Sequence, residues 1–276
     1  MAFGDLSRVN TNLQSMGALR QLQSTNQELG IRQLRLATGS RINRAEDDSA
    51  GYTISKKLEA RVRGQAQALS NVGDAKSMLT VAEGSLNTVM DILQTMKEKS
   101  IQAANDTMGT DERTAIKSEL DALSAEVDDI IGDSTFNGNT LFTSDAFTFQ
   151  VNAESGDTFA VNVGSTSATG LGVSTASLVV DSATNASLTI DNIDDAIDDI
   201  SAQLSGLGDS QKRLSFKQEN LTTSMNNYEA ARSRISDADF AKEQMEIVKL
   251  QILQQTGTAA TAQANQGAQS ILSLIG

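Results

Sequence analysis

The fold class is decided by the segment Gln65-Ala-Gln-Ala-Leu-Ser-Asn-Val-Gly-Asp-Ala-Lys-Ser-Met-Leu-Thr-Val-Ala-Glu-Gly-Ser-Leu-Asn-Thr-Val-Met-Asp-Ile-Leu-Gln-Thr-Met96. Small and apolar residues recur in it at alternating intervals of three and four. This spacing puts one apolar stripe along a long helix, as in coiled coils. The stripe, which has a weaker start at Leu58, consists of Ala68, Val72, Ala75, Leu79, Ala82, Leu86, Val89, Leu93 and Met96.

Two further segments carry the same spacing. They predict a mainly α-helical fold, with long helices in a coiled-coil-like elongated bundle. Gln211, Gln218 and Arg232 occupy apolar positions of the longer one, where polar groups weaken packing but can set the register. The apolar positions are Ile116, Leu120, Leu123, Val127 and Ile130 in one segment, and Ile193, Ile197, Ile200, Leu204, Leu207, Leu214, Leu221, Met225, Tyr228 and Ile235 in the other.

Both ends of the chain are also predicted to be helical. Residues 37–51, near the end of the N-terminal helical segment, are rich in Gly, Ser, Asn and Asp, which predicts a helix break or hinge. After Lys249 no charged residue follows through Gly276. An isolated helix of this kind is marginal in water, so we expect both ends to pack together and against copies of the chain. Their stripes are Leu6, Val9, Leu13, Met16, Leu22, Leu29 and Leu36, and Met245, Val248, Ile252, Ala259 and Ala262.

The middle of the chain has a different pattern. Residues 147–151 and 158–163 alternate apolar and polar side chains around a turn at 152–157, which predicts a β-hairpin. Residues 164–187 are rich in Ser, Thr, Ala and Gly. They are compatible with one short strand at 178–180 or with a loop.

Composition argues against an enzyme. The 276 residues include no Cys, His, Trp or Pro, which excludes Ser-His-Asp and Cys-His catalysis and zinc sites with nitrogen or sulfur ligands. We expect no cofactor. The formal net charge of -13 disfavours nucleic acid as a partner. The sequence contains no apolar run of about 20 residues, so no membrane span is predicted. The N-terminal residues lack the pattern of a cleaved signal peptide, so export would need another route.

Three consecutive acidic residues lie at the predicted break, and one interpretation of them is a metal site. Glu46, Asp47 and Asp48 could hold a hard cation, but a carboxylate just before a helix more commonly caps its free N–H groups. We therefore expect Asp47 or Asp48 to cap a helix.

Five ordered blocks closely resemble the signature motifs of bacterial flagellins, the subunits of flagellar filaments. Together they cover most of the chain outside residues 143–189. They are Leu36-Ala-Thr-Gly-Ser-Arg-Ile-Asn-Arg-Ala-Glu-Asp-Asp-Ser-Ala-Gly51, Phe136-Asn-Gly-Asn-Thr-Leu-Phe142, Ala230-Ala-Arg-Ser-Arg-Ile-Ser-Asp-Ala-Asp-Phe-Ala241, Gln251-Ile-Leu-Gln-Gln-Thr-Gly-Thr258 and Ala262-Gln-Ala-Asn-Gln266.

The resemblance implies a structural subunit of the helical filament used for swimming. Residues 1–44 with 238–276 would form an inner coiled coil, residues 45–142 with 190–237 a helical bundle, and residues 143–189 a small β-hairpin segment. The first signature block supplies the residues expected at the hinge, which are Gly39, Arg41, Asn43, Asp47, Asp48 and Gly51. The residues expected at subunit contacts are Leu13, Leu29, Leu86, Leu93, Glu119, Ile252, Leu253 and Leu272.

The resemblance also implies partners and a location. The main partner would be the chain itself, as a homopolymer. Flagellar cap and hook-junction proteins would contact the filament, and an export chaperone would bind the C-terminal segment. The subunit would leave the cell through the flagellar type III channel, without a cleaved signal, for the extracellular filament.

One family feature is degenerate here. Some flagellins carry L-Q-R-x-R-E-L, which an animal innate immune receptor recognises, whereas this chain has Leu93-Gln-Thr-Met-Lys-Glu-Lys99. Gln94 and Glu98 persist, but Thr95 and Lys97 replace the two arginines. Neither reproduces a guanidinium fork, so we expect weak or no receptor activation.

Three other functions remain as alternatives. A flagellar hook-filament junction protein has similar ends, although both intact signatures and the short middle favour the filament subunit. A signalling coiled coil such as a chemoreceptor domain would need a membrane span or a helical hairpin tip, and the middle here is β-like. An enzyme is the remote option, because no pair of carboxylates is placed for acid-base chemistry.

Overall fold

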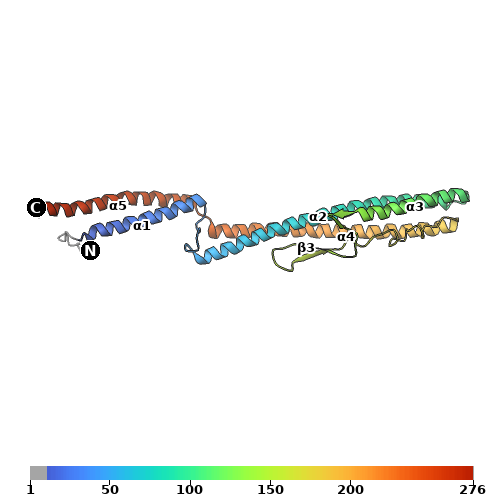
Figure 1. Ribbon diagram of the computed structural model, residues 1–276, viewed down its shortest axis with the longest axis horizontal. Coiled ribbons are helices and arrows are strands. Elements are labelled where there is room, and N and C mark those ends of the chain that lie inside the picture. The colour runs from blue at the N-terminus through green and yellow to red at the C-terminus, as the bar shows by residue number, and fades with distance from the viewer. Residues whose placement is uncertain (1–10, 276) are drawn as a thin grey trace. The chain divides into compact units, whose positions relative to one another are not determined.

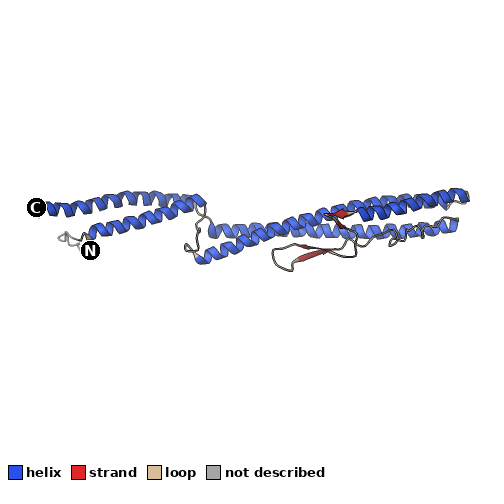
Figure 2. Ribbon diagram, viewed as in Figure 1, coloured by secondary structure: helices blue, strands red, loops and turns tan. Residues whose placement is uncertain are grey.

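A computed structural model describes the backbone of residues 11–275 and the side chains of residues 11–266. The described chain is mainly α-helical, as predicted, with two short antiparallel strand pairs (Figures 1 and 2). Its elements are α1 (Leu13–Thr38), α2 (Ser49–Ala103), α3 (Thr110–Asp133), β1 (Thr135–Phe136), β2 (Asn139–Thr140), β3 (Phe147–Gln150), β4 (Thr158–Val161), α4 (Ala183–Ser236) and α5 (Phe240–Ile275).

The chain divides into two compact units. Among the described residues, 11–60 and 227–275 form one, which we call the terminal unit, and 61–226 form the other, the central unit. In the described part of the chain, no helix is long and apolar enough to span a membrane.

In the central unit, α2 and α4 run antiparallel. The Gln65 amide nitrogen donates to the Ser224 hydroxyl at 3.0 Å, and further along α2 the Lys97 ammonium lies 2.5 Å from the Asp194 carboxylate. Residues later in α2 therefore contact residues earlier in α4. The predicted stripes form the seam, because Leu79, Leu86, Leu93, Ile193, Ile200 and Leu214 are all fully buried.

Polar residues on the α4 stripe bond across this seam. The Gln211 amide nitrogen donates to Glu83 of α2 at 2.8 Å, and Gln218 accepts a hydrogen bond from Lys76 at 3.3 Å. Both bonds join α4 to α2, which is consistent with the predicted role in register. Arg232 instead pairs with Glu229 of its own helix.

The third helix of the central unit, α3, folds back onto α2. Ile116, Leu120 and Val127 of its stripe are buried. The Lys99 ammonium of α2 lies 2.6 Å from the Glu119 carboxylate of α3. At the other end of α3, the hydroxyl of Ser134, which follows the helix, donates a hydrogen bond to the Ser85 hydroxyl of α2.

The predicted hairpin is present as β3 and β4. Phe147 pairs with Val161, and Gln150 pairs with Thr158. Phe159 and Val161 are buried in the core of the central unit. Residues 178–180 form a loop rather than a strand, although Leu178 and Val180 are buried in the same core.

A second, smaller hairpin was not predicted. It joins β1 and β2 through Asn137 and Gly138, with φ angles of 51° and 80°. Positive φ at both central residues is the requirement of a type I′ turn, which Asn-Gly favours. The dipeptide was a usable signal, but strands of two residues carry no alternation to support it.

Candidate assembly surface

In the terminal unit, α1 and α5 pair antiparallel. Near the start of α1 the Asn12 amide nitrogen donates to the Ala264 carbonyl at 2.9 Å. Further along, the Gln254 amide nitrogen donates to Asn26 at 2.7 Å. The two chain ends therefore pack together, as the sequence predicted.

The seam between these helices is apolar at one end and small and polar at the other. Leu29 is buried against Ile247 and Leu250, with Leu36 beside them. Along the rest of α5, Gln254, Gly257, Thr261 and Ala264 are half-buried. A Cβ atom at Gly257 would lie 3.3 Å from the Leu22 side chain, so the glycine allows a close approach of the helices.

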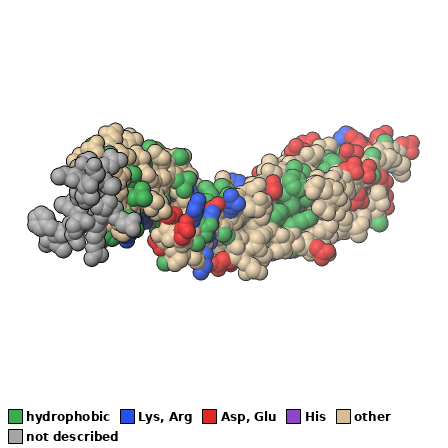
Figure 3. Space-filling view, turned by 60° about the vertical axis from the view of Figure 1, so that its left-hand side comes forward, with side chains coloured by type: hydrophobic (Ala, Val, Ile, Leu, Met, Phe, Trp, Pro, Cys, Tyr) green, Lys and Arg blue, Asp and Glu red, His purple; other side chains and the backbone are tan. Residues whose placement is uncertain are grey.

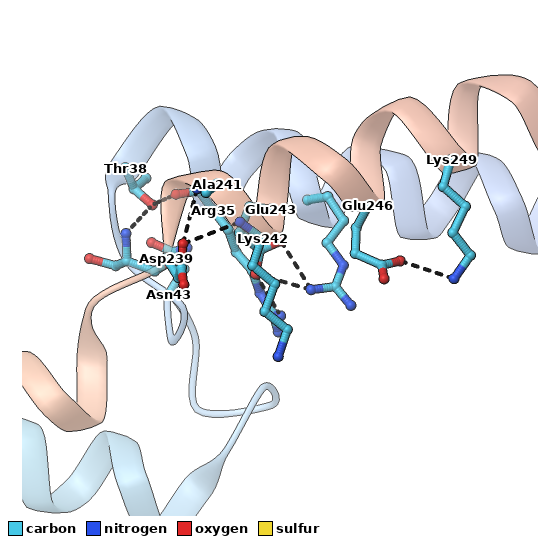
Figure 4. A network of polar contacts seen from close by, with 11 residues as sticks. Arg35, Thr38, Asn43, Asp239, Ala241, Lys242, Glu243, Glu246 and Lys249 are labelled. Atoms are coloured by element: carbon cyan, nitrogen blue, oxygen red, sulfur yellow. Dashed lines mark hydrogen bonds and ion pairs between the residues drawn. The ribbon is translucent and has the colours of Figure 1, made fainter.

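A buried carboxylate lies at the start of this seam (Figure 4). Glu243 is 5% exposed, and its two oxygens each accept a hydrogen bond from Arg32 at 3.0 Å. The Arg35 guanidinium lies 3.8 Å away. This cluster joins α5 to α1. Removing the arginines would leave the Glu243 carboxylate buried without a counterion. This ion pair was not predicted from the sequence.

The predicted helix break is present at residues 39–48, which we call the signature loop. Gly39 ends α1 in the left-handed region with φ of 70°. Its carbonyl accepts from the Ala238 amide at 2.9 Å, and the Arg41 amide donates to the Ser236 carbonyl at 2.7 Å. The break after α1 thus pairs with the break between α4 and α5.

The acidic residues of the signature loop serve the backbone. One Asp47 oxygen accepts from the amides of Asn43 and Arg44, both at 3.0 Å, and these bonds hold the pKa of Asp47 below its ordinary value. Asp48 caps α2 by accepting from the Gly51 amide at 2.9 Å. The predicted cap is therefore Asp48. Within the described residues no group of acidic side chains is placed to hold a metal ion.

Both terminal helices carry a second apolar face that is open to solvent. The predicted stripe of α1 divides, since Leu22, Leu29 and Leu36 face α5 while Leu13 and Met16 are exposed. The predicted stripe of α5 faces away from α1. Its larger residues do not pack on α1 but lie on the exposed face, namely Met245, Val248 and Ile252, with Leu253 exposed beside them.

Other residues expected at subunit contacts lie elsewhere. Leu86 and Leu93 are completely buried within the central unit, so they belong to the core of one subunit rather than to its surface. Leu29 is likewise buried, in the α1–α5 seam. Glu119 pairs with Lys99 as described above. Leu272 lies in the part of α5 whose side chains fall outside the described residues.

The degenerate receptor patch lies on α2. Gln94, Thr95 and Glu98 are exposed. Lys97 is half-buried and paired with Asp194 of α4, so its ammonium is engaged within the subunit.

Comparison with known proteins places these features in one family. Residues 9–146 match the model of the bacterial flagellin N-terminal helical region, and residues 190–275 match that of the C-terminal helical region. The chain is 37% identical to a flagellin of Halalkalibacterium halodurans over 270 residues, covering 97% of this chain and 99% of that protein. It is 36% identical to a flagellin of Bacillus subtilis over 304 residues, with the same coverage.

A solved structure shares the fold. A putative flagellar hook-associated protein from Vibrio parahaemolyticus superposes with a TM-score of 0.61, over 69% of this chain and 100% of that one. The two sequences are 15% identical, so this likeness concerns the fold alone.

Proposed function

Because the chain belongs to the bacterial flagellin family, we propose that it polymerises through the exposed apolar faces of its two terminal helices. The protein is a structural subunit of the helical bacterial flagellar filament. Flagellins are a family of structural proteins. The family matches favour the filament subunit over the hook-junction alternative.

The observation that carries the proposal is the pair of open faces on α1 and α5. A helix with apolar residues on two opposite faces needs two partners to bury both. Inside the subunit, α1 and α5 bury one face each. Leu13 and Met16 of α1, and Met245 and Ile252 of α5, remain 48–67% exposed. Copies of the chain supply the missing partners.

The chemistry of α5 suits burial in a polymer. No charged residue follows Lys249, so stacking this segment against other copies buries no unpaired charge. The partner face on a neighbouring copy differs from the face it covers. Such a heterologous contact extends into a helical filament when its rotation does not close a ring.

We place the two layers as the family resemblance implies. Residues 1–44 and 238–276 form the inner layer, with residues 45–142 and 190–237 around it and residues 143–189 on the bundle. The break at the signature loop falls near the first of these boundaries, and it serves as the hinge. Export runs through the flagellar type III channel, with a chaperone covering the apolar C-terminal segment. Cap and hook-junction proteins bind at the ends of the filament.

Receptor activation by this flagellin is weak. Thr95 offers no guanidinium, and Lys97 is held by Asp194 at 2.5 Å. A reporter-cell assay should give low potency for the unaltered protein, and Thr95→Arg with Lys97→Arg should raise it. Full potency of the unaltered protein would contradict this proposal.

The assembly proposal is tested with one charge on the open face of α5. Ile252→Asp places a carboxylate at a side chain that is 56% exposed, so the monomer should keep its helical content. After addition of filament seeds it should stay in the supernatant on sedimentation. Leu188→Asp is the matched control, because Leu188 of the central unit is 57% exposed. Normal filaments of Ile252→Asp under the electron microscope would refute the assigned face.

A further inference from the structure

An aromatic side chain projects from the middle of α4. Phe216 is 61% exposed, the highest value among the large apolar residues of the central unit. Leu214, two positions earlier, is fully buried in the seam. At about 100° per residue, Phe216 therefore points away from that seam. Lys212, one turn earlier on the same face, is also exposed.

A shallow, wide-open groove of about 500 Å³ lies between α2 and α3 of the same unit. Val81, Gly84 and Thr88 line it from α2, and Glu126, Asp129 and Asp133 line it from α3. A Cβ atom built on Gly84 meets no atom within 4 Å, so the space beside this glycine is open. The groove thus combines an uncharged side with an acidic side.

The projecting aromatic and the groove lie on different faces of the central unit. On α2, Glu83 contacts Gln211 and so marks the side that faces α4. Val81 and Thr88 are turned from Glu83 by about 160° and about 140° at the helical period. The groove opens away from α4, and Phe216 cannot reach it within one chain.

Charge also distinguishes the two features. Asp and Glu side chains are spread over the visible face of the central unit, most densely at its right-hand end (Figure 3). Phe216 has Lys212 one turn before it, Lys217 directly after it and Glu219 one turn after it, all exposed. A single exposed aromatic is ordinary on a protein surface. Here it lies beside Lys212, and an open groove lined by the carboxylates of Glu126, Asp129 and Asp133 lies on another face.

We propose that Phe216 of one subunit inserts into the α2–α3 groove of a neighbouring copy, with Lys212 against the carboxylates of α3. This inference rests on the proposed assembly and adds a second contact, made by the central unit. A projection and a groove on different faces form a heterologous contact, which continues from copy to copy. Buried aromatic anchors commonly dominate the energy of an interface, and opposite charges align it.

The first test fills the groove from within. Gly84→Leu puts a side chain into the open space, while the helix itself gains from losing a glycine. Gly73→Leu is the matched control, because Gly73 is an exposed glycine of α2 that also has nothing within 4 Å and does not line the groove. In seeded assembly, Gly84→Leu should raise the critical concentration about tenfold and the control less than about twofold.

Denaturation of both monomers checks that each variant folds. If Gly84→Leu were unfolded, Phe216→Ser would replace it. That change removes an exposed side chain, and it should give a similar rise in critical concentration.

The second test captures the contact covalently. The chain has no cysteine, so introduced thiols report on chosen positions alone. Glu219→Cys, one turn from Phe216, is combined with Thr88→Cys at the groove, and filaments are treated with a short bis-maleimide. A ladder of linked subunits is expected. Glu219→Cys with Gly73→Cys is the control pair and should give mostly monomers.

The outcomes separate this contact from the assembly proposal. Filaments that grow normally with Gly84→Leu and give no ladder would overturn the Phe216 contact and leave the terminal-helix proposal standing. If the unaltered protein did not polymerise on seeds, the terminal-helix proposal would fail. Cross-linking of the concentrated protein would then decide alone, with a ladder supporting the Phe216 contact and unlinked monomers overturning it.

Discussion

Replacing Gly51 by alanine should destabilise α2, although alanine is ordinarily the better helix former. Gly51 lies in the first turn of α2 and donates its amide to the capping Asp48 at 2.9 Å. A Cβ atom at this position would lie 2.5 Å from the other Asp48 oxygen and 2.7 Å from the Ile42 side chain. Ile42 is itself buried, with 7% of its surface exposed.

The magnitude follows from three contributions. Removing a helix cap costs about 1 kcal/mol. Forcing an extra carbon into a filled site costs about 1–3 kcal/mol. The helical preference of alanine over glycine offsets up to about 1 kcal/mol. The net loss in the free energy of unfolding is therefore about 1–3 kcal/mol.

The assay compares Gly51→Ala with Gly73→Ala by urea denaturation monitored by circular dichroism. The control glycine of the same helix has nothing within 4 Å, so Gly73→Ala should gain up to about 1 kcal/mol. Amide hydrogen exchange across residues 40–55 should show faster opening only in Gly51→Ala. A Gly51→Ala protein as stable as the control would refute the reasoning.

Two further predictions concern the core and the signature loop. Leu86→Asp buries a carboxylate at a fully buried position and should cost at least about 3 kcal/mol, so circular dichroism should show loss of helix in the monomer as well as loss of assembly; a normally folded monomer would contradict its assignment to the core. Asp47 has a lowered folded-state pKa, so its stabilising effect is complete above the ordinary value of 3.8 and is lost as the pH falls through the lower value. NMR titration of the Arg44 amide should therefore show a midpoint below 3.8 that disappears in Asp47→Asn, and a midpoint at or above 3.8 would count against these hydrogen bonds.

The seams of the central unit were readable from the sequence. Apolar residues recur at intervals of three and four in each of the three helices, around Leu79, Leu120 and Ile200. A strongly periodic apolar pattern over several turns has few other structural solutions. The hairpin at 147–163 was readable for the same reason, through its period of two. A carboxylate cap at Asp47 or Asp48 followed from the chemistry of an acid placed before a helix, and the structure assigns it to Asp48.

The terminal unit shows where sequence reasoning stops. The stripe of α5 through Met245 and Ile252 was correctly recognised as apolar, but the sequence could not show which face meets α1. The face of α5 that meets α1 carries Glu243, Ile247 and Gly257. A buried ion pair and a close approach of the two backbones take the place of large apolar side chains there. A periodicity identifies an amphipathic face, whereas its partner depends on shape and charge across the contact.

The sequence by itself therefore determined the helical fold class, the periodic seams, the β-hairpin and the family. Each of these depends on the local order of residues. Only the tertiary structure decided that Leu86 is internal, that a Cβ at Gly51 would displace the Asp48 and Ile42 side chains, and that one face of α5 remains open. The physical reason is that burial and close approach are properties of pairs of surfaces. The residues that meet in them are separated along the chain, as Arg32 is from Glu243.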